Sequence, residues 1–242
     1  MAMFITFEGG DGSGKSTQTK ILYEYLKKQG YEIILTHEPG GTSFGNMCRA
    51  ILLEQPKDKK YKVGNRAQVL GFCASRAQLI EEVIMPNKNN DQVIIVCDRF
   101  ADSTIAYQVY GGDLDEKLDD AEKIIEFATH GIKPDLTIYL DIPIDEGLKR
   151  IQGRLKTDDT LHQFGPERQL SFLDSNIFDE QKLQFHKKVR EGYEWSIKHD
   201  KPERWFRVDA NRPLEVIAEE IRGRVMIILA EHKIFPKNKT SK

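Results

Sequence analysis

Residues 9–16 read Gly-Gly-Asp-Gly-Ser-Gly-Lys-Ser, a complete G-x-x-x-x-G-K-[ST] phosphate-binding loop near the start of the 242-residue chain. A short apolar stretch, Met3–Phe7, precedes the loop, and apolar residues recur at helical spacing after it, from Ile21 to Leu26. Glycines let backbone N–H groups converge on phosphate oxygens at a helix N-terminus. Because strand, loop and helix follow in the required order, the motif predicts a nucleotide site rather than an incidental glycine-rich turn.

Two side chains of this loop carry the predicted chemistry. Lys15 is expected to reach the β- and γ-phosphates, and Ser16 is expected to hold Mg²⁺. The predicted nucleotide-binding residues of the loop are Gly9, Gly10, Asp11, Gly12, Ser13, Gly14, Lys15, Ser16 and Thr17. GTPases, motor ATPases and kinases all share such a loop, but no Asn-Lys-x-Asp guanine-recognition signature follows a strand-like run. The sequence therefore disfavours a GTPase.

Charge and hydropathy give no sign of nucleic acid or a membrane as the main partner. The net charge is −2, the pI is about 6.3 and the mean hydropathy is −0.52. We expect no nucleic-acid partner, and no membrane partner because no apolar run approaches the roughly 18 residues that a membrane span needs. We expect no signal peptide, because the loop begins by residue 9, and Cys48, Cys73 and Cys97 lack metal-binding spacing. We therefore expect a cytoplasmic protein with reduced thiols.

Short apolar runs alternate with longer amphipathic stretches. The strand-like runs are 3–7, 33–35, 93–97, 136–140 and 205–208, and helical periodicity covers 15–29, 66–85, 115–129, 145–155, 179–199 and 213–231. Because the strand-like runs are almost continuously apolar, they predict strands covered on both faces, as in a parallel sheet. The predicted fold class is α/β, a five-stranded parallel sheet flanked by helices in one domain, 1–232. Ligands of such sheets bind at the carboxyl ends of the strands.

Two segments interrupt this alternation. Residues 154–178 are polar and irregular, and a loop of this length inside one domain is usually functional or disordered. Residues 233–242 form a basic tail, which we expect to be a flexible terminus.

The end of the third strand-like run carries Asp98 and Arg99. An aspartate at this position can organise the Mg²⁺ shell, and an arginine can hold a phosphate through two hydrogen bonds. A salt-bridged strand end is the alternative interpretation.

A second group of residues suits an anionic ligand with an aromatic ring. Phe72 and Arg76 stand at i and i+4 on one predicted helix face, although a core phenylalanine beside a surface arginine is the commoner meaning of this pattern. Residues 38–42 (Glu-Pro-Gly-Gly-Thr) form a rigid turn after the second strand, with Arg49 beyond it. This turn can equally be an ordinary Pro-Gly turn.

Taken in order, several segments resemble motifs of the thymidylate kinase (dTMP kinase) family. They are 7–17 (Phe-Glu-Gly-Gly-Asp-Gly-Ser-Gly-Lys-Ser-Thr), 36–42 (Thr-His-Glu-Pro-Gly-Gly-Thr), 72–78 (Phe-Cys-Ala-Ser-Arg-Ala-Gln), 98–100, 103–104, 106–108, 134–141, 147–150 and 209–210. The resemblance extends over roughly residues 3–230. It implies the P-loop fold of nucleoside monophosphate kinases, and transfer of the γ-phosphoryl group of ATP to dTMP, giving dTDP and ADP, with Mg²⁺. It also implies a homodimer.

The resemblance assigns substrate-binding residues: Glu8, Pro39, Arg49, Phe72, Arg76, Arg99, Thr104, Tyr107 and Gln108. It implies that Arg76 and Arg99 hold the acceptor phosphate and that Phe72 stacks on the thymine. Pro39 and Tyr107 would then help to form the wall around the deoxyribose.

The remaining assignments also follow from the resemblance. Thr104 and Gln108 would flank the base, while Glu8 and Asp11 would lie near the sugar and the phosphates, with Arg49 close to the acceptor phosphate. The predicted catalytic residues are Lys15, Asp11, Arg99 and Arg154, and the predicted metal-holding residues are Ser16 and Asp98. No general base is assigned, because phosphoryl transfer depends mainly on positioning and charge neutralisation.

The segment after the fourth strand resembles the lid of the bacterial type of these kinases. Gly12 stands where other members carry a catalytic arginine, so we expect a lid at about 150–178 to supply it. Arg154 is the first choice for that arginine and Arg168 the second, while Arg150 is expected to contact adenine or phosphate. The Asp-Arg-x-Glu segment frequent in the family is replaced here by Asn-Ile-Phe-Asp at 176–179. His186 and Arg190, on the next helix, are expected to face solvent.

Two alternatives remain open. A kinase of the same fold could act on another nucleoside monophosphate, such as dUMP, or on a deoxynucleoside. A non-catalytic P-loop switch would bind nucleotide but would not need a second anion pocket.

Overall fold

A parallel sheet forms the centre of the molecule, in a computed structural model that describes residues 2–53, 63–157 and 180–237. Its strands are β1 (Met3–Gly9), β2 (Glu32–His37), β3 (Val93–Asp98), β4 (Leu136–Asp141) and β5 (Trp205–Asp209). They lie in the order β2-β3-β1-β4-β5, and every pairing is parallel. The predicted α/β fold with five parallel strands is therefore confirmed.

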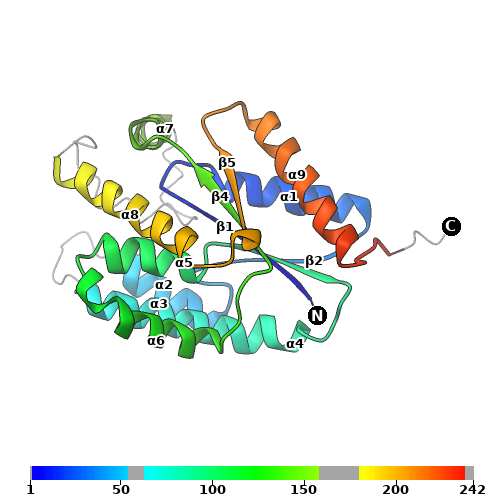
Figure 1. Cartoon of the computed structure of the whole chain (residues 1–242), viewed down its shortest axis with the longest axis horizontal. Helices are drawn as coiled ribbons and strands as arrows, with labels where there is room; N and C mark the ends of the chain where they lie inside the picture. The colour runs from blue at the N-terminus through cyan, green and yellow to red at the C-terminus, as the bar shows by residue number, and fades with distance from the viewer. Residues whose placement is uncertain (1, 54–62, 158–179, 238–242) are drawn as a thin grey trace.

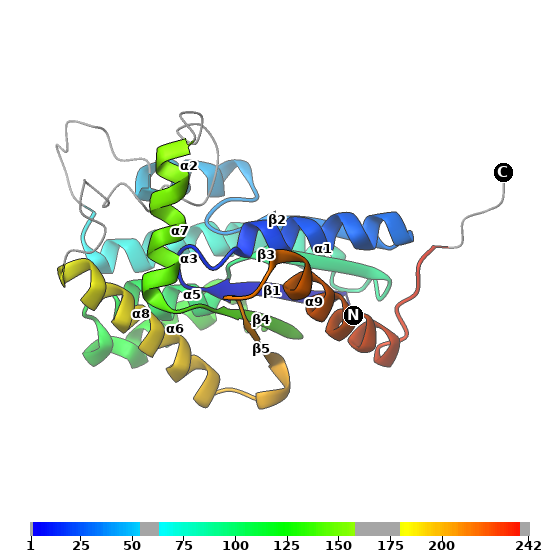
Figure 2. The same cartoon turned by 90° about the horizontal axis from the view of Figure 1, so that it is seen from above.

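Helices cover both faces of the sheet (Figure 1). The described helices are α1 (Lys15–Gln29), α2 (Ser43–Leu53), α3 (Asn65–Leu79), α4 (Met85–Asn87), α5 (Ala101–Thr104), α6 (Leu118–Thr129), α7 (Ile144–Thr157), α8 (Glu180–Lys198) and α9 (Leu214–Glu231). Helices α1 and α9 lie on one face, and α3, α5, α6 and α8 lie on the other. Figure 2 shows α2, α7 and α8 gathered at the end of the sheet away from both termini. None of the described helices is long and apolar enough to span a membrane.

The alternation of side chains along β1 divides its residues between the two faces. Met3, Ile5 and Phe7 pack in the core cluster with α1 and α9, whereas Phe4 packs in the cluster that includes α3. Glu8 shares the period of Phe4, so the fold turns its carboxylate toward α5 and α8 rather than toward α1. A fully buried acidic residue thereby reaches the carboxyl edge of the sheet, beside the phosphate-binding loop.

The helices depart from the sequence-based predictions in two places. Helix α2 was not predicted, because Phe44, Met47 and Ile51 are exposed and its apolar residues do not form a single inward stripe. Helix α5 and the π-helical segment Ile105–Tyr110 were also missed, since this region is buried almost all round and has no amphipathic period.

The strands and the termini add three further corrections. The edge strands β2 and β5 are only half-buried, so covering on both faces holds for the three central strands. The stretch predicted to be irregular from residue 154 begins as helix, because α7 runs to Thr157; residues 158–179 lie outside the described part. The predicted flexible tail begins too early at 233, because Ile234 is buried in the core and the backbone N–H of Lys237 donates to the carbonyl of Gly30.

Candidate active site

The phosphate-binding loop connects β1 to α1 with a backbone that only glycine tolerates well. Gly12 has φ +75° and Gly14 has φ +90°, both in the left-handed region. A Cβ atom on Gly12 would lie 2.1 Å from the carbonyl oxygen of Gly147 in α7. Because the loop packs directly on α7, there is no room at Gly12 for a larger side chain such as arginine.

Lys15 lies at the centre of the loop and is almost fully buried. Its ammonium group donates hydrogen bonds to the carbonyl oxygens of Gly9 (2.9 Å) and Gly10 (2.8 Å) and to Ser13 Oγ (3.2 Å). Burial, together with the neighbouring Arg99 guanidinium, lowers the pKa of Lys15 to about 8. The ammonium is therefore held within the loop, where it can meet phosphate oxygens.

Ser16 and Asp98 meet beside the loop, as the sequence-based metal site requires. Ser16 Oγ donates to Asp98 Oδ2 over 2.5 Å, while Asp98 Oδ1 is buried and accepts no hydrogen bond from any described residue. A hydroxyl and a carboxylate are the hard oxygen ligands that Mg²⁺ prefers, and the unpartnered Oδ1 can accept a metal ion or its water. No cluster of three or more His, Cys, Asp or Glu side chains that could hold a metal occurs among the described residues. These two oxygen ligands thus fit a metal ion that is coordinated partly by phosphate oxygens rather than by protein side chains alone.

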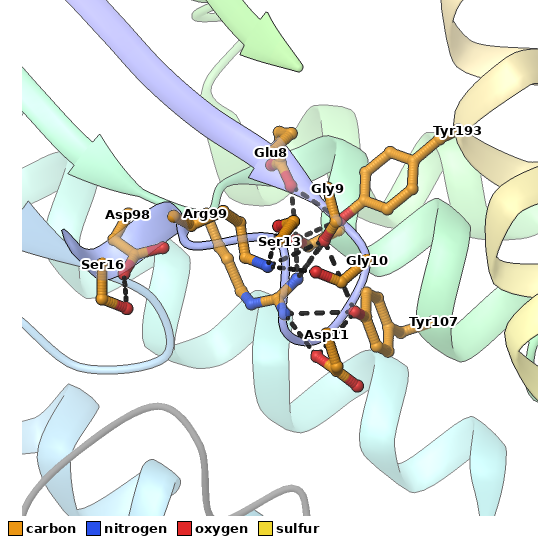
Figure 3. A network of polar contacts seen from close by, with 12 residues as sticks. Glu8, Gly9, Gly10, Asp11, Ser13, Ser16, Asp98, Arg99, Tyr107 and Tyr193 are labelled. Carbon is orange, nitrogen blue, oxygen red and sulfur yellow. Dashed lines mark hydrogen bonds and ion pairs between the residues drawn. The ribbon is translucent and has the colours of Figure 1, made fainter. Parts of the chain in front are cut away.

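Arg99 links the loop to the rest of the site (Figure 3). Its Nη2 donates to Asp11 Oδ1 (2.8 Å) and to Tyr107 Oη (3.1 Å), and Tyr107 Oη donates to the same carboxylate oxygen. Burial alone would raise the pKa of Asp11, but Arg99 and Lys15 outweigh it, so the pKa lies below its ordinary value. Arg99 itself has φ +69°, a conformation that costs a non-glycine residue of the order of 1 kcal/mol and is often found at functional sites.

Two residues outside the predicted site complete this network. Ser103 Oγ donates to Glu8 Oε2 over 2.6 Å, and Tyr193 Oη donates to the same oxygen over 2.9 Å. Arg99 Nη1 contacts both hydroxyls. Burial, followed by the nearby Asp102 carboxylate, raises the pKa of Glu8 to about 7. Ser103 belongs to one of the recognised motifs, whereas Tyr193 comes from a helix whose sequence resembles an ordinary amphipathic one.

A pocket opens beside Arg99 on the α3 side of the site. Its lining consists of Glu38, Phe72, Arg76, Arg99, Phe100, Ser103, Tyr107 and Gln108. Arg76 is 1% exposed and pairs with Glu38, whose Oε2 accepts from Arg76 Nε over 2.9 Å. Arg76 Nη2 donates to Thr104 Oγ1 over 2.9 Å. The commoner interpretation of the sequence pattern is therefore half right: Phe72 packs in a core cluster with Leu52 and Leu53, but Arg76 is buried rather than on the surface, and both side chains line one pocket.

The remaining predicted residues lie around the phosphate loop and the pocket beside Arg99. Pro39 accepts a hydrogen bond from Arg49 Nη1 through its carbonyl oxygen (3.0 Å), so these two residues lie together next to Glu38. Arg150 Nη2 donates to the carbonyl oxygen of Ala210, after β5 and away from the acceptor pocket. Arg154 lies in α7, but its side chain, like Arg168 as a whole, falls outside the described part.

The prediction that His186 and Arg190 lie on a solvated face is only partly right, because both residues are half-buried and make contacts within the protein. His186 is partly buried and lines a small hollow together with Asp11. Arg190 Nη2 forms an ion pair with Asp141 Oδ1 over 2.8 Å, because α8 packs across the carboxyl end of β4. The helical pattern could not reveal this, since the partners come from elements distant in sequence.

A P-loop at the carboxyl edge of a parallel sheet, beside a second pocket lined with buried arginines, defines a phosphotransferase of the nucleoside monophosphate kinase type. The thymidylate kinase family model matches residues 7–221. The chain is 40% identical over 230 residues to the thymidylate kinase of Roseiflexus castenholzii, covering 95% of each chain. It is 38% identical to that of Desulfovibrio desulfuricans, covering 92% of this chain and 94% of the other, and 37% identical to that of Geotalea uraniireducens, covering 96% and 100%. The chain belongs to the thymidylate kinase family.

Proposed function

We propose that this protein transfers the γ-phosphoryl group of ATP to dTMP, giving dTDP and ADP. The observation that carries the proposal is the position of Arg99. Its guanidinium contacts the phosphate loop through Asp11 and also lines the second pocket. A donor phosphate on the loop and an acceptor phosphate in the pocket would therefore share one positive charge, as in-line transfer requires.

The donor nucleotide would bind with its phosphates on the loop. Backbone N–H groups and Lys15 would bind the β- and γ-phosphates, and Arg150 would lie near the adenine. Ser16 and Asp98 would hold Mg²⁺, which supplies charge neutralisation at the phosphate oxygens when it is bound. Lys15 and Arg99 would stabilise the charge that develops on the migrating group, and a lid arginine, Arg154 or Arg168, would add to them.

The acceptor would lie with its phosphate toward Arg99 and its base toward Phe72. None of the described hydrogen bonds of Arg76 goes to the phosphate loop; they go to Glu38, Cys73 Sγ, the Phe100 carbonyl and Thr104. We therefore assign Arg76 to the base end of the pocket and leave the acceptor phosphate to Arg99. Phe72 offers the flat apolar face on which a pyrimidine can stack.

The proposed reaction is tested directly by ³¹P NMR. The enzyme, Mg-ATP and dTMP should yield the paired phosphorus signals of dTDP and ADP, and no inorganic phosphate above the rate without dTMP. Release of inorganic phosphate alone would contradict a kinase and would favour the nucleotide-dependent switch.

We further propose a cytoplasmic homodimer. Apolar side chains are exposed on three packed helices: Phe44, Met47 and Ile51 on α2, Leu70 on α3 and Phe127 on α6, the last at 87% exposure. Apolar residues gathered on one side of a protein commonly mark an interface. Light scattering of the wild-type protein should give twice the chain mass, and Phe127→Glu should shift the protein toward the monomer; a monomeric wild type would contradict the proposal.

A further inference from the structure

Tyr193 brings a hydroxyl from α8 into the centre of the site. Its side chain is fully buried, and its Oη lies 3.2 Å from Arg99 Nη1, 2.9 Å from Glu8 Oε2 and 3.1 Å from Ser103 Oγ (Figure 3). Arg99 and Tyr193 are 94 residues apart in the sequence. None of the predicted roles uses this tyrosine.

The direction of these hydrogen bonds follows from the groups involved. A guanidinium can only donate, so the phenol oxygen accepts from Arg99 Nη1. A carboxylate that is ionised can only accept, so Tyr193 donates its single phenol proton to Glu8 Oε2 over 2.9 Å; the carbonyl oxygen of Gly9, a second acceptor, lies farther away at 3.3 Å. Tyr193 therefore links the Arg99 guanidinium to the Glu8 carboxylate. Because Glu8 fixes the direction of the phenol hydroxyl, the phenol oxygen can hold Arg99 in one orientation. Because an ionised carboxylate strengthens such bonds, the arrangement depends on the charge of Glu8.

Close packing of α8 makes this position possible. A Cβ atom on Gly192 would lie 2.7 Å from Ala106 Cα, so a larger residue at 192 would push α8 away from the segment that carries Tyr107. The Tyr193 ring packs on Tyr107 and Tyr139, with centroid distances of 6.3 and 5.2 Å. The ring is thus held on two sides, and its hydroxyl is directed toward Arg99, Glu8 and Ser103.

We propose that Tyr193 is a positioning residue of the phosphoryl-transfer reaction, which holds Arg99 Nη1 so that the guanidinium faces the acceptor phosphate. The inference rests on the proposed role of Arg99 and extends it. Asp11 and Tyr107 hold the other terminal nitrogen of Arg99, so the guanidinium is gripped at both ends. Tyr193 itself need not touch the substrate, because it acts through Arg99.

The test compares Tyr193→Phe with Tyr139→Phe. The first variant keeps the packed ring and removes the hydroxyl that contacts Arg99 and Glu8. Tyr139 is equally buried in the same aromatic cluster, but its hydroxyl forms no hydrogen bond with the described residues, so it is a matched control. We expect Tyr193→Phe to lower kcat/KM for dTMP about 10- to 100-fold with little change in the KM for ATP, the effect of a misplaced charged donor.

A pH profile separates positioning from packing. The charged groups that face Glu8 are Arg99 after β3, Asp102 on α5, Lys15 on α1 and Arg76 on α3. Removing a donor to Glu8 disfavours its ionised form, so the acid limb of kcat/KM should move to higher pH in Tyr193→Phe and stay in place in Tyr139→Phe.

A double-mutant cycle with Arg99→Lys completes the test. If Tyr193 acts through Arg99, its removal should cost little in the Arg99→Lys background. Wild-type kinetics in Tyr193→Phe, equal losses in both tyrosine variants, or full additivity with Arg99→Lys would each overturn the proposal. An assay of the wild type separates the proposal about Tyr193 from the proposal that dTMP is the substrate. If the wild type phosphorylates another monophosphate, the proposed substrate is wrong, and the two tyrosine variants are compared with that acceptor instead.

Discussion

The phosphate loop and the acceptor pocket lie side by side but are built in different ways. The loop is one uninterrupted segment, residues 9–16, and its shape comes from backbone conformations that its glycines permit. The pocket is assembled from side chains of α3, of α5 and of the segment after α5, together with residues that directly follow β2 and β3. In the proposed function, the loop would supply general phosphate binding, whereas the pocket would determine the choice of acceptor. Damage to the loop should therefore affect every acceptor equally, and damage to the pocket should not.

The largest effect is expected at the loop, with Lys15→Ala. Removing the buried ammonium takes away a charge aimed at the migrating phosphoryl group, which should lower kcat about 1,000-fold for any acceptor. Steady-state ADP release with saturating Mg-ATP measures the loss. Substantial turnover by this variant would contradict the assignment of Lys15 to the transferred phosphate.

Gly12→Ala tests whether the loop depends on backbone shape. The added Cβ would meet the Gly147 carbonyl, and Gly12 has a positive φ, so the loop or α7 must move. We expect kcat to fall about 100-fold, because small displacements of aligned groups are costly. Gly10→Ala is the matched control, since a Cβ atom there meets no heavy atom within 4 Å. Similar losses in both variants would argue against the contact with α7.

Arg76→Ala tests the pocket. Losing charge-assisted contacts at the base end should raise the KM for dTMP about 10- to 100-fold and leave the KM for ATP nearly unchanged. The change also leaves the Glu38 carboxylate buried without its partner, which costs about 3–5 kcal/mol of stability. The double variant Arg76→Met, Glu38→Gln removes both charges together and is therefore the control for this loss of stability. Equal effects on both KM values would remove Arg76 from the acceptor site.

The smallest effect concerns Glu8, which lies where the two regions meet. Its pKa is about 7 in the folded protein, against an ordinary glutamate value of 4.5, so the folded state binds more protons than the unfolded state between these two values. Stability should consequently fall as pH rises from 4.5 to 7, by about 1–3 kcal/mol for a shift of this size. Urea unfolding at pH 5 and pH 8 should show Glu8→Gln gaining stability relative to the wild type at the higher pH. An unchanged difference between the two proteins would show that Glu8 has an ordinary pKa.

The sequence predicts the phosphate loop better than it predicts the acceptor pocket and the residues around it. The loop and the central strands were predicted because glycine spacing and apolar runs are local signals. Phe72 and Arg76 could be paired by helical spacing, but only the fold shows that Glu38 neutralises the arginine. Tyr193 could not be found, because a tyrosine in an amphipathic helix usually belongs to the core and its partners lie on other elements. The positive φ of Arg99 is likewise set by tertiary contacts.

The most direct test is ADP release with Mg-ATP and a panel of acceptors: dTMP, dUMP, dCMP, dGMP, AMP, UMP and thymidine. We expect a strong preference for dTMP, since Phe72, Arg76 and Arg99 line one pocket, where we propose that they bind the base and the phosphate. Preference for another monophosphate would keep the phosphoryl-transfer site but contradict the assignment of the base pocket. ATP hydrolysis that is indifferent to every acceptor would contradict the central claim that this protein is a dTMP kinase.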